Sequence, residues 1–598
     1  MTKLKDTIQK LWALFNQREK KKLLLLLFMM ILAAVFETVG IGLIVPFVGI
    51  VTNPTMIHEQ AMLSKVYDLL SFQSTNAFIL FGVVVLLSIF IIKNAYLLFF
   101  FNVQYRVIFN QRVKLSRAMF KEYLTKPYTF HLQRNSAELL RNVNGEVTKV
   151  FGGILLSGFQ LLTEILVLLS ILSLLIITAP LATLTSGILL GGSVLVFFKI
   201  FRKKITHLGK EEQRVNREVI KWVNQGLGAS KEVKVTGKEN YFVNMYDEQS
   251  RILASNTIYK SMLDQVPRLF IETLLVAVVL ITMIITVFQG TDTSKLVATM
   301  SLFAMAAFRL MPSITRIVAM LTSIRFSQPA LEVIYNDLIK DHKGNNSILE
   351  ESAMELKNPV KVNHSEKTFR YSINLENVYF RYPNQEEYSI RNLSLTIPIG
   401  HSVAFVGTSG AGKTTIIDII LGLLEPEKGR ICVDGKDLNE LLSVWQNKIG
   451  YIPQSIFLSD DTILKNVAFG ISDKEIDEAA VLRAIEDAQL KEFIDTLPEG
   501  LDTVVGERGV RLSGGQRQRI GIARALYHNP EIIFLDEATS ALDNETEIEI
   551  MKAIDGLKGQ KTLIIIAHRL STIENCDIVF KVEKGKLVSV ENKLRQTM

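Results

Sequence analysis

Long apolar stretches alternate with charged ones through the first 325 residues of the chain. Six of the apolar stretches reach the about 20 residues that a helix needs to cross about 30 Å of hydrocarbon. They are Leu23–Val51, Ala77–Phe101, Phe151–Ile177, Leu181–Phe201, Leu269–Phe288 and Leu296–Ile324. The pattern predicts an all-α membrane half with six transmembrane helices.

Basic residues are distributed unevenly between these stretches. The N-terminal run NQREKKK and residues 102–150 and 202–268 are rich in Lys and Arg, whereas residues 52–76, 178–180 and 289–295 are nearly free of them. An excess of Lys and Arg marks the cytoplasmic side of a membrane protein. We therefore expect a multi-pass membrane protein with both termini in the cytoplasm.

Two of the connecting segments carry helical patterns of their own. Residues 103–124 keep apolar residues at helical spacing without Gly or Pro, so the second membrane helix is predicted to continue into the cytosol. The first outer connection, residues 54–70, places five apolar residues on roughly one helical face. They are Ile57, Met62, Val66, Leu69 and Leu70. A short amphipathic external helix and an ordinary structured loop are both compatible with this pattern.

The second half of the chain has a different pattern. Residues 326–372 are largely polar and read as a linker, and short apolar strands alternate with helices after it. We expect a transmembrane domain at 1–325, a linker at 326–372 and a C-terminal α/β domain at 373–598. The net charge of +7 is explained by basic residues beside the membrane helices, so no nucleic-acid partner is predicted.

A glycine-rich loop is the first candidate binding element of the α/β domain. FVGTSGAGKTT follows the apolar strand HSVAFV and precedes an apolar helix, which is the setting of a phosphate-binding loop. Backbone N–H groups and the helix N-terminus can hold phosphate there. We expect Lys413 to bind the β and γ phosphates of ATP and Thr414 to bind Mg²⁺. The ATP-binding residues of the loop are Gly407, Thr408, Ser409, Gly410, Ala411, Gly412, Lys413, Thr414 and Thr415.

Two acidic residues follow a second apolar strand in EIIFLDEATSALD. A buried parallel strand carries such residues to the edge of a sheet where catalysis occurs. Asp536 is expected to position Mg²⁺, partly through water, and Glu537 to polarise the attacking water as general base.

The sequence LSGGQ, residues 512–516, resembles the signature of ATP-binding cassette proteins. Ser513, Gly514, Gly515 and Gln516 can form a second anion-binding nest at a helix N-terminus. In that family the nest closes on the γ-phosphate held by a partner domain. One chain carries one phosphate loop and one signature, so the resemblance implies a homodimer with two active sites.

Other family landmarks follow in order along the chain. Tyr382 resembles the aromatic residue that stacks on adenine, Gln454 the catalytic glutamine that contacts Mg²⁺, and Asp543 the acid of the loop that crosses the dimer. His568 resembles the switch histidine that senses the γ-phosphate, and Val504 stands where exporters often carry an acid. Six spans and one cassette resemble an exporter-type half-transporter, which implies the type I ABC exporter fold and an ATP hydrolase coupled to transport.

Basic residues within the predicted spans concern the cargo. Arg309 and Arg316 lie seven residues apart and project from nearly one face of their helix. Arg268 and Lys93, which belong to two other predicted helices, can join them. Arginine matches the oxygens of a phosphorylated headgroup. The alternative is that each arginine pairs with an acid inside the membrane, and Glu37, Glu164 and Glu272 are available.

Four segments narrow the cargo further by resemblance. VPRLFIET, FRLMPSITRI, NGEV and the possible external helix are similar to the bacterial flippases of lipid-linked oligosaccharides used in protein N-glycosylation. That resemblance implies a polyprenyl-pyrophosphate-linked glycan as cargo, arginines that meet the pyrophosphate, and an external helix that engages the lipid tail. Export of another lipid, a hydrophobic drug or a peptide remains open, as does a membrane-anchored regulatory ATPase.

Overall fold

The computed structural model describes residues 2–43, 47, 50–51, 54–178, 180–288, 293–340, 369–536, 548, 551–552, 554–567 and 573–593, except for some side chains between 41 and 310. The chain divides into two compact units. One contains Met1–Lys126 and Arg134–Lys361, and the other contains Pro127–Gln133 and Val362–Met598. Each unit is described by itself.

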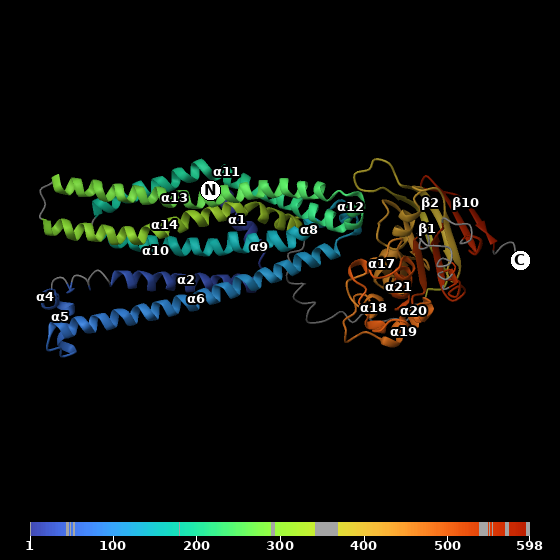
Figure 1. Ribbon diagram of the computed structural model, residues 1–598, viewed down its shortest axis with the longest axis horizontal. Helices are drawn as coiled ribbons and strands as arrows, with labels where there is room; N and C mark the ends of the chain where they lie inside the picture. Colours follow the sequence, from blue (N-terminus) through green and yellow to red (C-terminus); the bar gives the residue numbers. More distant parts are fainter. Residues whose placement is uncertain are drawn as a thin grey trace. The chain divides into compact units, whose positions relative to one another are not determined.

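The first unit is built from long helices that lie alongside one another (Figure 1). The longest are α6 (Thr75–Thr125), α11 (Pro180–Gly228), α13 (Glu239–Phe288) and α14 (Thr293–Tyr335). Helix α6 has 51 residues and, at a rise of 1.5 Å per residue, is about 75 Å long, more than twice the thickness of a hydrocarbon core. The prediction that this helix continues past the membrane is confirmed.

Shorter helices complete the unit. They are α1 (Thr2–Ala13), α2 (Gln17–Gly42), α8 (Ser136–Arg141), α9 (Val147–Lys149), α10 (Ser157–Thr178) and α12 (Ser230–Thr236), with π-helical turns η1 (Asn142–Glu146) and η2 (Val150–Leu156). Within the described residues, four helical segments are long and apolar enough to cross a membrane. They are Gln17–Gly40, Thr75–Thr125, Ser136–Ser173 and Met311–Ile339.

The first outer connection forms two short helices, α4 (Met56–Glu59) and α5 (Ala61–Leu69). The chain breaks between them at Gln60, which has an extended backbone. Ile57 is fully buried against Phe78, whereas Leu69 is 83% exposed. A helical segment is therefore present, but the expectation of one continuous apolar face is wrong because the break turns Ile57 inward and leaves the end of α5 in the open.

The C-terminal end of α6 is joined by buried polar groups to the segment that follows the last long helix. Tyr123 Oη donates a hydrogen bond of 2.6 Å to Asp337 Oδ2 in η3 (Asn336–Lys340). Asn142 Nδ2 in η1 donates to the same oxygen at 3.3 Å and to Tyr123 Oη at 3.1 Å. Residues 326–340 are thus helical instead of linker-like, because buried apolar residues at helical spacing continue to Leu338. Residues 341–368 of the expected linker lie outside the described residues.

The second unit contains two sheets. The six-stranded sheet has the order β10-β9-β3-β8-β7-β6, in which only the β9–β10 pair is antiparallel. Its strands are β3 (Ser402–Val406), β6 (Ile449–Ile452), β7 (Ile532–Asp536), β8 (Thr562–Ile566), β9 (Ile578–Glu583) and β10 (Lys586–Asn592). The antiparallel sheet has the order β2-β1-β4-β5. It contains β1 (Ser372–Phe380), β2 (Ile390–Pro398), β4 (Lys428–Val433) and β5 (Lys436–Asp437).

Helices cover these sheets and enclose two apolar cores. They are α16 (Lys413–Ile420), α17 (Leu438–Lys448), α18 (Ile463–Val467), α19 (Glu478–Asp487), α20 (Lys491–Asp495) and α21 (Gly514–Leu526). Helix α7 (Tyr128–Gln133) is assigned to the same unit, but it has no buried residue and neither core includes it. One core includes Trp445, which is fully buried and donates its indole N–H to the carbonyl of Ile420. This packing fixes α16, and with it the loop that precedes α16, against the parallel sheet.

Candidate functional site

The phosphate-binding loop runs from the end of β3 to the start of α16, as the sequence predicts. A Cβ atom on Gly407 would lie 2.1 Å from the carbonyl oxygen of Val582, so no other residue fits without moving β9. Gly412 caps α16 with a φ of 101°, a conformation that favours glycine. The loop is therefore held tightly to its neighbouring strand, and the N–H groups of the first turn of α16 are available to a phosphate.

Lys413 is 6% exposed although it carries a charge. Its ammonium group donates to the carbonyl oxygens of Gly407 at 2.9 Å and Thr408 at 3.1 Å. The side chain therefore folds back over its own loop, and these two bonds compensate for the burial of the charge.

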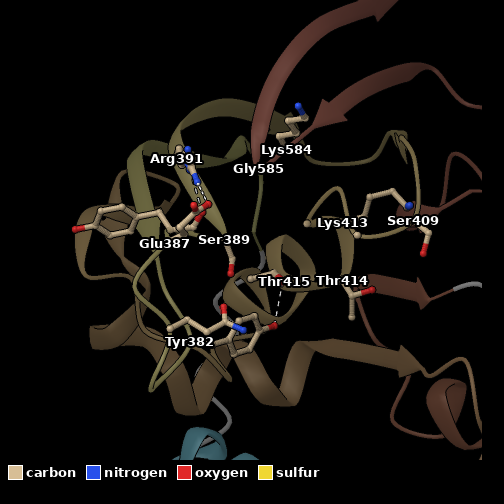
Figure 2. Close-up of a pocket in the computed structure, with 14 residues that line it drawn as sticks. Tyr382, Glu387, Ser389, Arg391, Ser409, Lys413, Thr414, Thr415, Lys584 and Gly585 are labelled. Carbon is tan, nitrogen blue, oxygen red and sulfur yellow. Dashed lines mark hydrogen bonds and ion pairs between the residues drawn. The ribbon is translucent and has the colours of Figure 1, made fainter.

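A pocket of about 630 Å³ opens beside this loop (Figure 2). Its lining residues are Tyr382, Gln385, Glu387, Tyr388, Ser389, Arg391, Ser409, Gly410, Gly412, Lys413, Thr414, Thr415, Lys584 and Gly585. Tyr382 Oη lies 3.0 Å from Thr415 Oγ1, and its ring meets Phe380 edge-on. The pocket thus brings the predicted adenine-stacking tyrosine and the phosphate loop together, with an aromatic ring at one end and a cation at the other.

The pocket also contains residues that sequence reasoning missed, most notably Arg391 and Lys584. The lining does not include three of the predicted loop residues, Gly407, Thr408 and Ala411. They belong to the structure of the loop itself, and Gly407 lies against β9. Neither Arg391 nor Lys584 belongs to a local motif. Only the pairing of distant strands brings them to the loop.

The parallel sheet aligns further predicted residues along one edge. In its register, Phe405 of β3 faces Ile566 of β8, and Ile566 faces Asp536 of β7. Asp536 ends its strand almost fully buried, and Gln454 follows the adjacent strand β6 in an exposed position. Both thus lie at the edge that bears the phosphate loop. Glu537, Asp543 and His568 lie outside the described residues.

Two acidic side chains approach each other beneath the loop. Burial, reinforced by the charge of Asp536, raises the pKa of Asp418 on α16 to about 6. Burial also raises the pKa of Tyr451 on β6, with Asp536 again adding to the effect. The negative charge of Asp536, which adds to the effect of burial on both pKa values, is attractive to a cation.

The available ligands suit magnesium. Within the described residues there is no cluster of three or more His, Cys, Asp or Glu. Thr414, Asp536 and Gln454 instead offer a hydroxyl, a carboxylate and an amide oxygen, and Mg²⁺ prefers oxygen ligands from one or two carboxylates together with substrate phosphates. The set fits Mg²⁺ held jointly with a nucleotide, where the ion would neutralise phosphate charge.

The LSGGQ segment forms the start of α21. Ser513 accepts a hydrogen bond from the N–H of Gln516, and the Gln516 side chain accepts one from the N–H of Ser513, which is a reciprocal capping box. Gly514 is exposed at the same helix start. None of these residues lines the nucleotide pocket of the same chain.

The candidate cargo residues in the membrane half differ from one another in their surroundings. Arg316 is ion-paired with Glu164 on α10, with Nε 2.6 Å from Oε1 and Nη2 3.3 Å from Oε2. The pairing alternative therefore holds for Arg316, whose side chain is still 46% exposed. Arg268 on α13 is exposed, and Lys93 on α6 lies over the ring of Phe90. The Arg309 side chain lies outside the described part of the chain.

Both halves of the chain match known families. The ABC transporter family matches residues 390–540, and the ABC transporter transmembrane region matches residues 22–311. The ATP-dependent lipid A-core flippase of Ralstonia nicotianae is 32% identical over 488 residues, which are 81% of this chain and 78% of the relative. The protein of the same name from Saccharophagus degradans is 33% identical over 494 residues, 81% of this chain and 79% of that one.

A solved structure extends the comparison to the fold. The bacterial Atm1-family ABC exporter with ATP bound superposes with a TM-score of 0.75 at 24% identity, covering 97% of this chain and 96% of that one. The expected type I exporter fold, a helical membrane domain followed by an α/β nucleotide-binding domain, is thereby confirmed. Together with the phosphate loop, the aligned sheet edge and the signature helix, these matches establish that the chain belongs to the ABC transporter family, as a multi-pass, exporter-type half-transporter that couples ATP hydrolysis to transport.

Proposed function

We propose that the transporter is a lipid flippase that moves a polyprenyl-pyrophosphate-linked oligosaccharide from the cytoplasmic to the outer leaflet of the bacterial inner membrane. The observation that carries this proposal is the Arg316 side chain on α14, which keeps 46% of its surface exposed within an apolar helical unit. Arg268 is exposed on α13, which packs along α14. Cations exposed between membrane helices match a phosphorylated headgroup better than a neutral cargo.

The Arg316–Glu164 pair shapes how such a headgroup would bind. A phosphate oxygen pair has the same fork geometry as the Glu164 carboxylate that Arg316 already meets through two nitrogens. Cargo binding would exchange one anionic partner for another, so Arg316 would never be left unpaired in an apolar setting. In the same proposal Arg309 and Lys93 line this route, and α4 and α5 meet the lipid tail.

A second candidate cargo is a glycolipid of the lipid A-core kind. Relatives that carry this cargo in their names align with about four-fifths of the chain. Both candidate cargoes combine sugars, phosphate and a long apolar anchor, so the arginines suit either of them. A hydrophobic drug or a peptide needs no phosphate-binding cation and fits this surface less well.

The proposed assembly is a homodimer with both termini in the cytoplasm, a transmembrane domain at 1–325 and a cassette at 373–598. The signature residues Ser513 to Gln516 lie outside the pocket of their own chain, so a second copy would bring them to the γ-phosphate. In this site Lys413 and the loop N–H groups bind the phosphates, and Tyr382 stacks on adenine. Thr414, Gln454 and Asp536 hold Mg²⁺, Glu537 orients the attacking water, and His568 and Asp543 complete the site.

The test is ATP-dependent movement of labelled lipid in liposomes that contain the purified transporter. We expect a fluorescent polyprenyl-pyrophosphate sugar to change leaflet when Mg²⁺ and ATP are present, and not with the Glu537→Gln variant, which should still bind ATP. A labelled lipid A-core glycolipid and a neutral drug serve as parallel cargoes. Movement of lipid A-core alone would select the second candidate, and movement of the drug alone would refute the flippase proposal.

A further inference from the structure

A tight turn between β9 and β10 forms part of the nucleotide pocket. Glu583 pairs with Lys586, so Lys584 and Gly585 alone make the loop of this hairpin. Their φ angles are 48° and 75°, both in the left-handed region. Turns with two positive φ angles favour Asn, Asp or Gly at the first position. Lysine at Lys584 therefore sits in a conformation that its own side chain disfavours, and such residues concentrate at functional sites.

The turn is docked on the walls of the pocket. Gly585 donates its N–H to the carbonyl of Ala411 in the phosphate loop at 2.9 Å, and its own carbonyl accepts the N–H of Arg391 at 2.9 Å. A Cβ atom on Gly585 would lie 2.1 Å from the carbonyl oxygen of Ser389. These contacts hold the turn between the phosphate loop and the start of β2. The position of Lys584 is consequently fixed relative to the site where phosphates bind.

The basic residues of the pocket differ in how their charges are matched. Arg391 pairs with Glu387 at 2.8 Å and donates to the carbonyl of Tyr388, and Lys413 donates to carbonyls of its own loop. Among the residues that the structure describes, Lys584 has no ion pair and no side-chain hydrogen bond. Figure 2 shows Lys584 at the edge of the pocket opposite Tyr382. The charge of Lys584 is therefore not matched by another described residue, in contrast to the bonded side chains of Arg391 and Lys413.

We propose that Lys584 is a nucleotide-binding residue, which supplies positive charge to the phosphate chain from the β9–β10 turn. A lysine ammonium is a compact charge on a flexible four-carbon stem, so it can reach a phosphate from the rim of the pocket without a change in the turn. The residue sets affinity for the anionic nucleotide. It takes no part in the cleavage of the γ-phosphate, which belongs to the sheet edge at Asp536.

The test compares nucleotide binding and stability in variants of the full-length transporter purified in nanodiscs. Lys584→Gly removes the charge and the disfavoured conformation together, so we expect the melting temperature to stay or rise while the Kd for a fluorescent ATP analogue increases about threefold to fivefold at low salt. The KM for ATP should increase alike with kcat unchanged. Lys584→Arg should bind like the wild type, and the matched control Lys586→Ala, on β10 outside the pocket, should change nothing.

Two results would overturn the proposal. If Lys584→Gly and Lys584→Gln both bind the ATP analogue as tightly as the wild type, the lysine is a turn residue only. If they weaken binding equally at low and high salt, the cause is the shape of the loop, because a charge effect must shrink as salt screens it. Lys584→Gln keeps the left-handed turn under the same conformational demand, so it remains informative if the glycine variant folds differently.

Discussion

Lys413 and Arg316 are both cations, and the molecule provides their bonding partners in different ways. Lys413 is bonded to carbonyls five and six residues away in its own loop. Arg316 is bonded to Glu164, which is 152 residues away on another helix. The first arrangement is local and comes with the motif that contains it. The second depends on how α10 and α14 pack, so it belongs to the tertiary structure of the membrane half.

This difference suggests separate roles. The carbonyl oxygens that bind Lys413 belong to the phosphate loop itself, and a phosphate bound to this loop is a favourable partner for the same ammonium group. A carboxylate neutralises Arg316, so an anionic cargo has to compete with a ligand that is already in place. The nucleotide-binding half therefore holds its cation with the loop that would bind the ligand, and the membrane half holds its cation with a competing carboxylate.

The largest expected effect comes from removing the ammonium group of Lys413. Lys413→Ala should lower ATP hydrolysis about 100-fold or more, because a preorganised charge at the phosphates is lost. Steady-state phosphate release measures the effect, with thermal unfolding as the control for folding. Retention of more than about a tenth of the activity would mean that the loop N–H groups, and not Lys413, dominate phosphate binding.

A smaller effect is expected for a buried long-range pair in the membrane-half unit. Tyr123→Phe leaves the buried Asp337 carboxylate without its 2.6 Å hydrogen bond. We expect a loss of about 1.5–3 kcal/mol in stability, the range for hydrogen bonds to charged groups. Thermal unfolding in nanodiscs measures it, and Tyr96→Phe, which removes a hydroxyl bonded to the backbone carbonyl of Met29, is the matched control. Equal losses of stability in both variants would show that the buried carboxylate of Asp337 makes this hydrogen bond no stronger than one to a backbone carbonyl.

The ion pair between Arg316 and Glu164 is best tested with a double-mutant cycle. Glu164→Ala and Arg316→Ala should each lower the melting temperature, and the double variant should lose less than the sum. We expect a coupling of about 1 kcal/mol, since Arg316 is only half buried. If Glu164 competes with the cargo for Arg316, Glu164→Gln should also increase the affinity for a phosphorylated lipid. Additive losses of stability, together with an unchanged affinity for the lipid, would mean that Glu164 does not compete for Arg316. The distinction drawn above between Lys413 and Arg316 would then not hold.

The smallest effect concerns a carboxyl near Lys413. The pKa of Asp418 is about 6 in the folded protein against its ordinary value of 3.8, so the folded state prefers the protonated form. Its stability contribution is complete below the ordinary value and is lost as the pH rises through about 6. Asp418→Asn should therefore stabilise the transporter at pH 7.5 by about 1 kcal/mol after allowance for solvent screening, and not at pH 4.

Unfolding scans at several pH values, without nucleotide or Mg²⁺, measure this difference. A constant effect of Asp418→Asn from pH 4 to pH 7.5 would exclude titration of Asp418 as the cause and would point to the new amide's own hydrogen bonds.

Features encoded over short distances could be predicted from the sequence. Three such features are the phosphate loop, the buried strand before Asp536 and the extension of α6 beyond the length of a membrane span. Each depends on neighbouring residues, and each is found in the structure. Arg391 and Lys584 could not be placed in the pocket, because strand order and not spacing carries them to the phosphate loop. Helix periodicity does not say which helices become neighbours, so the sequence alone does not choose the partner of Arg316 among Glu37, Glu164 and Glu272.

The expected linker begins too early for a related reason. Composition places its start at residue 326, whereas Phe326, Leu331 and Ile334 are buried and their helical spacing continues α14. The sequence contains this signal, but the polar residues between 341 and 358 dominate the composition of the segment. The break at Gln60 had no such signal.

The hydrogen bond between Tyr123 and Asp337 joins residues 214 positions apart. It can form only after the ribosome has delivered every membrane helix between them, and closing so long a loop has an entropic cost that must be met by packing. The residues that lead from α14 to the cassette are therefore anchored late in synthesis. Biogenesis of this transporter should accordingly pass through a stage in which the helices are inserted, the end of α14 is still loose, and a quality-control protease can act on it.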